Sequence, residues 1–233
     1  MIGNLVSDER GFSLMELLVT LAVGSILLLA IFGALDFSVK ADSRVQDRVD
    51  STQRGRAAME LITRQLRSQI CLGPGYPAIP SGITSDGNSI TFYTDLGGDT
   101  PKLQRRTITY SGGTVFETDY NVAGTIPTAP TFTLARQNWV LAERLNLVAN
   151  VPFFRYYAFT PNPVTPNQWL NSTSPFTLAD ADKPRVVKVS ISFAADRLGV
   201  SRSMNNLALS TFQNDIYVRT SDASDPDHSP QCI

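Results

Sequence analysis

The stretch Gly11-Phe12-Ser13-Leu14-Met15-Glu16-Leu17-Leu18-Val19-Thr20-Leu21 opens an apolar run that continues to Leu35. Between Leu14 and Leu35 the only formal charge is that of Glu16. A run of about 18 or more apolar residues is long enough to cross a bilayer as a helix. A lone carboxylate in lipid costs several kcal/mol unless it finds a partner, so Glu16 is a candidate functional group.

Two other interpretations of this segment are a secretory signal and a plain membrane anchor. A secretory signal has an apolar core of only about 7–15 residues and is cut after that core, at small residues. Here the run is longer, and Gly11 comes before it. A plain membrane anchor remains open, but it gives no role to Gly11, Phe12 or Glu16.

The segment from Gly11 to Glu16 resembles the prepilin motif of type IV pilins and of the pseudopilins of type II secretion. In that family a membrane-embedded prepilin peptidase cuts after the glycine and methylates the new amino-terminal phenylalanine. The resemblance implies that the Gly11–Phe12 bond is cleaved and that Phe12 becomes the N-methylated first residue. Glu16 takes the family's glutamate position, where its carboxylate is expected to pair with the Phe12 amino group of a neighbouring subunit. Two buried charges are tolerated when they compensate each other in this way.

Length, charge and composition fit an anchored, exported domain. The 233 residues suggest one principal globular domain beyond the anchor. A net charge of −1 and a pI of about 5.8 give no basic field to attract nucleic acid, so no direct nucleic-acid binding is expected. The leader carries Asp8 and Glu9 beside Arg10, whereas leaders of this family are usually basic. The excess of positive charge that would mark the cytoplasmic side of the membrane is therefore small.

A long helix is expected to continue beyond the apolar run. Residues 37–72 contain no proline, Gly55 is their only glycine, and their charges alternate in sign as on a solvated helical face. A helix over residues 12–72 would be about 90 Å long at 1.5 Å per residue. That length suits a helix with one half in a membrane or filament core and the other half packed on a head domain. The predicted packing stripe is Val45, Val49, Met59, Ile62, Leu66 and Ile70, and Gly73-Pro74-Gly75 ends the helix.

Residues 54–67 resemble a narrower group, the PilW-like minor pilins and the J-type minor pseudopilins. The arginines of this segment are interpreted as a solvated face above the apolar stripe. The alternative is that Arg64 or Arg67 pairs with acidic side chains of a neighbouring subunit.

Beyond Pro80 the pattern changes to strands and turns. Strands are predicted at residues 89–95, 105–110, 114–120, 139–148, 152–159, 187–193 and 207–219, with a glycine turn at residues 111–113. In the last of these, residues 212–219 have the stronger strand pattern. Residues 122–131 and 160–175 are predicted to be loops because they contain several prolines. The aromatic run at residues 153–159 is interpreted as core and sheet-face packing rather than as a ligand-stacking surface.

Two cysteines, Cys71 and Cys232, bracket the β-rich body. On the outer side of a membrane such a pair more often forms a disulfide than a metal site or a nucleophile. We therefore predict a Cys71–Cys232 disulfide that ties the carboxyl-terminal tail to the end of the first helix.

Residues suited to catalysis or metal binding are scarce. His228 is the only histidine and lies in the tail, so neither a catalytic triad nor a multi-histidine zinc site is expected. Carboxylates cluster at residues 95–99 and 222–227, but neither cluster has EF-hand spacing, and both are interpreted as a solvated turn or tail. No enzymatic activity, cofactor or metal is predicted.

The predicted fold is therefore α+β, the pilin fold: a long N-terminal α-helix, its first half transmembrane, with an antiparallel β-sheet head domain. The expected segments are a leader (residues 1–11), an apolar helix (12–36), its amphipathic continuation (37–72), a β-rich head (73–220) and a tail (221–233).

The resemblance implies a minor subunit of a type IV pilus or of a type II secretion pseudopilus, in a tip or initiation complex. Its expected partners are prepilin peptidase, other major and minor pilin subunits and the inner-membrane assembly platform. The expected location is the inner membrane, crossed once, with the head outside the cytoplasm. The alternatives are a competence-pilus component for DNA uptake, a membrane-anchored adhesin or sugar-binding protein, and, least favoured, an anchored hydrolase.

Overall fold

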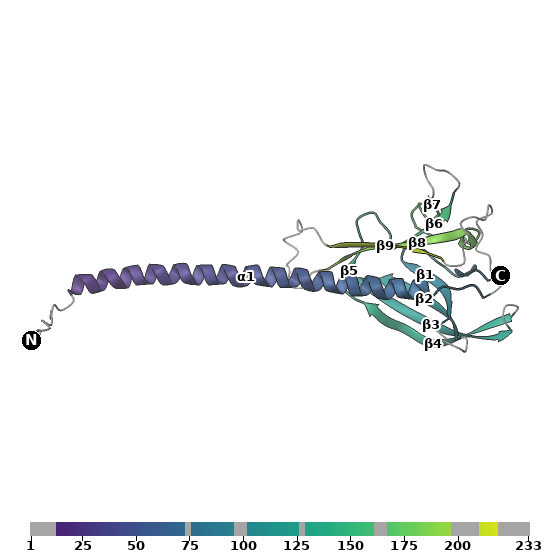
Figure 1. Ribbon diagram of the computed structural model, residues 1–233, viewed down its shortest axis with the longest axis horizontal. Helices are drawn as coiled ribbons and strands as arrows, with labels where there is room; N and C mark the ends of the chain where they lie inside the picture. The colour runs from purple at the N-terminus through teal and green to yellow at the C-terminus, as the bar shows by residue number, and fades with distance from the viewer. Residues whose placement is uncertain are drawn as a thin grey trace, which may run out of the picture. The chain divides into compact units, whose positions relative to one another are not determined.

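The fold is α+β, with a long amino-terminal helix followed by antiparallel β-sheets, as the sequence predicts (Figure 1). The computed structural model describes residues 13–72, 76–95, 102–125, 129–160, 167–196 and 210–218. Helix α1 spans Leu14–Arg67, 54 residues, and is long and apolar enough to cross a membrane. The chain forms two compact units, which divide between Arg48 and Val49.

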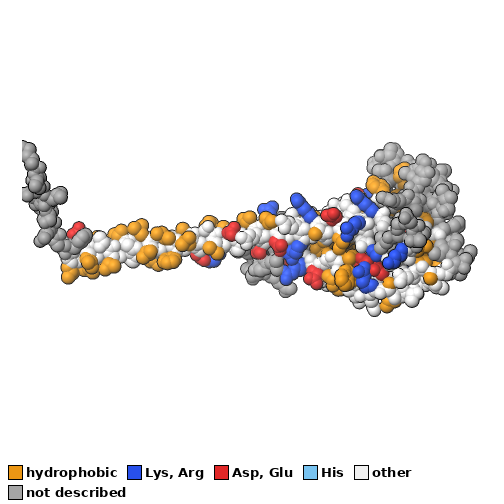
Figure 2. Space-filling model, turned by 60° about the horizontal axis from the view of Figure 1, so that its bottom comes forward, with side chains coloured by type: hydrophobic (Ala, Val, Ile, Leu, Met, Phe, Trp, Pro, Cys, Tyr) orange, Lys and Arg blue, Asp and Glu red, His pale blue; other side chains and the backbone are white. Residues whose placement is uncertain are grey.

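The first unit contains the apolar part of α1. Within residues 14–39 every large hydrophobic side chain is at least 51% exposed, and these side chains cover the amino-terminal part of the helix in Figure 2. Hydroxyl groups on this surface bond to the helix's own carbonyls: Thr20 Oγ1 donates to Glu16 O at 3.0 Å, and Ser25 Oγ donates to Ala22 O at 2.8 Å. An apolar helix surface whose hydroxyl groups bond to the helix itself suits a lipid or protein environment.

The second unit begins with the carboxyl-terminal part of α1, which supplies one face to the core. The buried residues of this face are Ser51, Gly55, Ala58, Ile62, Thr63 and Leu66. The predicted stripe is thus confirmed at Ile62 and Leu66. It is wrong at Val45 and Val49, which are 60% and 49% exposed.

Helix α1 ends at Arg67, before the predicted end at Leu72. The chain turns at Ser68 and then runs beside the first sheet. Gln69 bridges to Thr94, and the Ile70 amide donates to the Tyr93 carbonyl at 3.0 Å. Backbone pairing with a strand therefore replaces the last expected turn of the helix.

The first sheet is an antiparallel meander of β1 (Ser89–Asp95), β2 (Leu103–Ser111), β3 (Thr114–Thr125) and β4 (Ala129–Ala142), in that order. The predicted glycine hairpin is confirmed: Ser111 pairs with Thr114, and Gly112 and Gly113 between them have φ of 57° and 87°. Positive φ at both central positions is the geometry in which glycine is favoured.

Two boundaries in this sheet correct the sequence interpretation. The predicted loop at residues 122–131 is largely strand, because β3 runs to Thr125 and β4 begins at Ala129, with Gly124 opposite Pro130. Proline is tolerated there since β4 is an edge strand, where a missing N–H need not break a ladder. The strand predicted at residues 139–148 starts earlier and ends at Ala142, and Arg144 then adopts a φ of 60°.

The second sheet is built around β8 (Val186–Ala195). Strand β8 pairs with β6 (Phe154–Phe159), with the short β5 (Leu145–Asn146) and with β9 (Thr211–Tyr217), while β7 (Asn167–Trp169) pairs with β6. Strands β6 and β8 confirm two predicted strands, and β9 confirms the described part of the strand predicted at residues 207–219, of which residues 207–209 and 219 lie outside the described residues. Strand β7 lies within the predicted loop at residues 160–175, of which residues 161–166 are outside the described part.

One hydrophobic core joins both sheets to the carboxyl-terminal part of α1 (Figure 1). Its centre is a chain of stacked rings. Tyr110 of β2 stacks on Phe153 at 5.0 Å, Phe153 on Phe193 of β8 at 5.5 Å, and Phe193 on Phe212 of β9 at 5.6 Å. The predicted core role of the aromatic run is confirmed at Phe153, Phe154 and Tyr156, which are 0% exposed.

Candidate assembly segment and buried ion-pair network

The residues predicted to act in processing and assembly are only partly described. Gly11 and Phe12 lie outside the described residues, and so does Cys232. Glu16 is in the first turn of α1. Cys71 follows the strand-like pairing of Ile70 with Tyr93, beside the first sheet.

The Glu16 side chain is exposed and lies among exposed apolar side chains. The amides of Glu16 and Leu17 both donate to the Ser13 carbonyl, at 3.0 and 3.1 Å, which places the carboxylate at the positive end of the helix dipole. Within the described part of the chain, the ion pairs all lie elsewhere. Glu16 is therefore an acid available to a positive group of another molecule.

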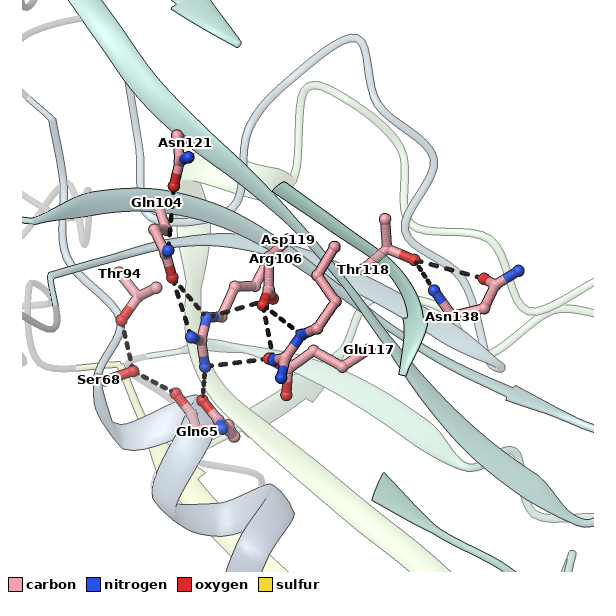
Figure 3. A network of polar contacts seen from close by, with 11 residues as sticks. Gln65, Ser68, Thr94, Gln104, Arg106, Glu117, Thr118, Asp119, Asn121 and Asn138 are labelled. Atoms are coloured by element: carbon pink, nitrogen blue, oxygen red, sulfur yellow. Dashed lines mark hydrogen bonds and ion pairs between the residues drawn. The ribbon is translucent and has the colours of Figure 1, made fainter. Parts of the chain in front are cut away.

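The most extensive polar cluster that the structure describes lies on the face of the first sheet that meets α1 (Figure 3). The strand register aligns Phe92, Arg106, Asp119 and Arg136 in one row across β1 to β4. Glu117 is two residues from Asp119 on β3. Because strand side chains alternate, Glu117 and Asp119 point to the same face.

Two arginines and two carboxylates form the centre of this network. Arg106 Nη1 lies 3.3 Å from Glu117 Oε1, and Arg106 Nε lies 3.5 Å from Asp119 Oδ1. Arg136 Nη2 approaches both acids, at 2.6 Å from Glu117 Oε1 and 2.7 Å from Asp119 Oδ2. With both acids ionised, the formal charges of the two arginines and the two acids cancel, which lowers the cost of burying them.

The same network ties α1 to the sheet. Arg106 Nη1 donates to Gln65 Oε1 on the last turns of α1, and Arg106 Nη2 donates to Gln104 Oε1 at 2.9 Å. Gln104 Nε2 in turn donates to Asn121 Oδ1 at 3.2 Å. Helix α1, β2, β3 and β4 are thus held by one connected set of polar groups.

Burial raises the pKa of Glu117. Loss of water around Glu117 and its hydrogen bond with Asp119 raise its pKa to about 7, while Arg106 and Arg136 act in the opposite direction. When both groups are ionised, Glu117 Oε2 and Asp119 Oδ1 have no hydrogen-bond partner. A proton on Glu117 supplies a donor toward Asp119. The side chains of Glu117 and Asp119 are 0% and 6% exposed, so the pair is closed to a substrate, and its contacts tie α1 to the sheet.

The sequence interpretation did not identify this network. A partial signal was present, since Val115, Glu117 and Asp119 alternate along one predicted strand and must share its core face. Nothing local to β3 indicates that Arg106, Arg136 and Gln65 meet these acids.

Comparison with known proteins identifies the amino-terminal segment. Residues 6–32 match the family described as "Prokaryotic N-terminal methylation motif". No curated protein and no solved structure matches the chain. The matched residues include Gly11, Phe12, Glu16 and most of the apolar run, which ends at Leu35.

The chain is therefore a type IV pilin-like protein: it carries a prepilin-type methylation motif on an α+β, pilin-like fold. The motif implies processing by a prepilin peptidase.

Proposed function

We propose that this protein is a minor pilin or pseudopilin, a structural subunit of a type IV pilus or of a type II secretion pseudopilus that acts in the tip or initiation complex. The observation that carries the proposal is the exposed apolar half of α1, which begins with the methylation motif and Glu16 and is followed by a β-rich head. The resemblance of residues 54–67 to PilW-like minor pilins and J-type minor pseudopilins supports the minor-subunit assignment.

In this proposal the chain is a substrate of the assembly machinery. The peptidase cleaves the Gly11–Phe12 bond and methylates the Phe12 amino group, while the apolar helix holds the subunit in the inner membrane with its head outside the cytoplasm. On the assembly platform the helix moves from lipid into contact with other major and minor subunits. The Glu16 carboxylate then pairs with the positive Phe12 amino group of a neighbour, which removes an unpaired charge from an apolar environment.

The first test is mass spectrometry of the amino-terminal peptide of membrane-purified protein. The expected chain starts at N-methylated Phe12. A chain starting at Met1 would indicate a membrane anchor alone. A chain starting beyond the apolar run would indicate a secreted protein, and either result would contradict the proposal.

The second test separates processing from assembly. The substitution Glu16→Gln is expected to leave cleavage at Phe12 intact and to deplete the subunit from filaments, because removing one partner of a buried ion pair costs about 3–5 kcal/mol. The control Thr20→Val removes only a hydroxyl that bonds to the helix's own carbonyls and should assemble normally.

Deletion of the gene distinguishes the remaining alternatives. Loss of a structural subunit reduces or abolishes filaments. Loss of an adhesin leaves filaments intact but abolishes attachment, loss of a competence-pilus component reduces DNA uptake, and loss of an enzyme changes none of these.

A further inference from the structure

An open groove of about 530 Å³ lies between the carboxyl-terminal part of α1 and β9, within the second unit. Six of its lining residues lie on α1: Arg56, Met59, Glu60, Thr63, Arg64 and Arg67. Their spacing of i, i+3, i+4, i+7, i+8 and i+11 forms a continuous stripe along one side of the helix. At 1.5 Å per residue the stripe is about 16 Å long, or about three helical turns.

The rim of the groove is basic. Arg56, Arg64 and Arg67 are exposed, and Glu60 is the one acidic lining residue, so the formal charge of the lining is 3 − 1, or +2. Some other arginines of the described chain have acidic partners: Arg54 pairs with Asp50, and Arg185 pairs with Asp182. The three groove arginines have no ion pair or hydrogen bond among the described residues.

The floor of the groove is partly apolar, and its two polar residues contact each other. Met59 and Phe212 are partly buried and pack against the core. Thr63 and Asn214, which also line the floor, bond to each other, with Asn214 Nδ2 donating to Thr63 Oγ1 at 3.0 Å. An apolar strip flanked by unpaired cations fits an amphipathic helix that carries acidic side chains beside its apolar face.

We propose that this groove binds an acidic amphipathic helical segment of another subunit of the filament. Apolar side chains of that segment lie on Met59 and Phe212, and its carboxylates pair with Arg56, Arg64 and Arg67. The inference rests on the proposed function, since it takes the partner from the same assembly. It also assigns a role to Arg64 and Arg67, for which the sequence left two interpretations open.

The test is site-specific photo-crosslinking in cells that assemble the filament from the full chain. Glu60→benzoylphenylalanine places the reactive group in the groove without removing an arginine. The expected product is a crosslink to an acidic helical segment of a different protein that itself carries a methylation motif, mapped to the residue by mass spectrometry.

Charge reversal decides whether that contact is electrostatic. The double substitution Arg64→Glu and Arg67→Glu is expected to reduce the crosslink by at least about tenfold, because like charges then face each other. Replacing the crosslinked acidic residue of the partner by lysine should restore it. The control Arg144→Glu makes the same kind of charge reversal once, at an exposed arginine outside the groove lining, and should leave the crosslink unchanged; the single variant Arg64→Glu is the equal-charge comparison.

Three results would overturn the groove proposal: no crosslink from position 60, a crosslink only to a second copy of this chain, or a crosslink unaffected by charge reversal. Tryptophan fluorescence of the charge-reversed protein checks that the head is folded, since Trp139 and Trp169 are the chain's two tryptophans and both lie in the second unit. Methylation at Phe12 is measured in the same preparation. Normal methylation and filament incorporation without the groove contact would refute the groove and leave the proposed function standing.

Discussion

Gly55 is a single residue on which the packing of α1 against the second sheet depends. A Cβ atom built at this position would lie 2.2 Å from Cε2 and 2.5 Å from Cζ of Phe212. Phe212 cannot easily move away, because it stacks on Phe193 at 5.6 Å and so belongs to the chain of rings in the core. The glycine is therefore required by the close approach of the ring. A sequence can show a glycine inside a predicted helix, but it cannot show which side chain lies above it.

We predict that Gly55→Ala destabilises the head by about 1–2 kcal/mol. Overpacking a filled site costs about 1–3 kcal/mol. Part of this cost is offset because alanine has a higher helix propensity than glycine, by up to about 1 kcal/mol. The measurement is urea unfolding of the full chain in detergent, followed by tryptophan fluorescence.

The matched control is Gly33→Ala, since a Cβ there meets nothing within 4 Å. It should leave the unfolding of the head unchanged. Adding Phe212→Leu to Gly55→Ala should recover part of the loss, because the two residues are in contact and their effects are coupled. Equal unfolding curves for the Gly55 and Gly33 variants would contradict the close packing.

At the level of elements, strands that are buried on one face (β6) or on both faces (β1 and β8) could be predicted from sequence, whereas the outer strand of the first sheet could not. Strands β1, β6 and β8 carry regular or dense apolar patterns and were located within a few residues. Strand β4 was not, because Leu134, Trp139 and Val140 on it are exposed and its register with β3 shifts at three places. Bulges of this kind also protect an edge strand from pairing with other chains.

The ion-pair network could also be predicted from sequence only in part. Alternation alone predicts that Glu117 and Asp119 share a face. Their arginine partners lie on β2 and β4, and Gln65 lies on α1, so the network depends on strand register and helix packing. Neither of these is encoded in a local pattern.

The network predicts that the stability of the head decreases as the pH rises from about 4.5 to about 7. In this window the folded Glu117, with its pKa raised from 4.5 to about 7, holds a proton that the unfolded chain has released. Because the native state binds more protons, the free energy of unfolding falls with increasing pH. At 1.36 kcal/mol per pKa unit the decrease is at most roughly 3 kcal/mol.

The measurement is urea unfolding of the full chain in detergent at pH 5 and at pH 7.5. The variant Glu117→Gln, which carries an amide donor at the position of the proton, is expected to lose most of this pH dependence. An unchanged slope in the variant would show that another group is responsible.

For the molecule as a whole, the fold class could be predicted because its signals are local: one long apolar run, a proline-free continuation and a β-rich remainder. The sequence interpretation expected one antiparallel sheet, but the described residues form two. The second sheet requires β8 to pair with β5, β6 and β9, which come from separate parts of the chain. The division at Arg48 likewise separates a unit with outward-facing apolar side chains from a unit with its own core, a contrast that composition alone could predict.

The Cys71–Cys232 disulfide remains a prediction. It concerns the whole molecule because it would close almost the entire head into one loop. On the chain-entropy model, a loop of that length stabilises the folded state by roughly 4–5 kcal/mol. We expect dithiothreitol to lower the free energy of unfolding by an amount of that order, and Cys71→Ser to do the same without a reductant. Since both cysteines would contribute to one bond, Cys232→Ser and the double variant should match Cys71→Ser, and none of the three should respond to dithiothreitol. Two reactive thiols in the unreduced exported protein, titrated after denaturation, would refute the bond.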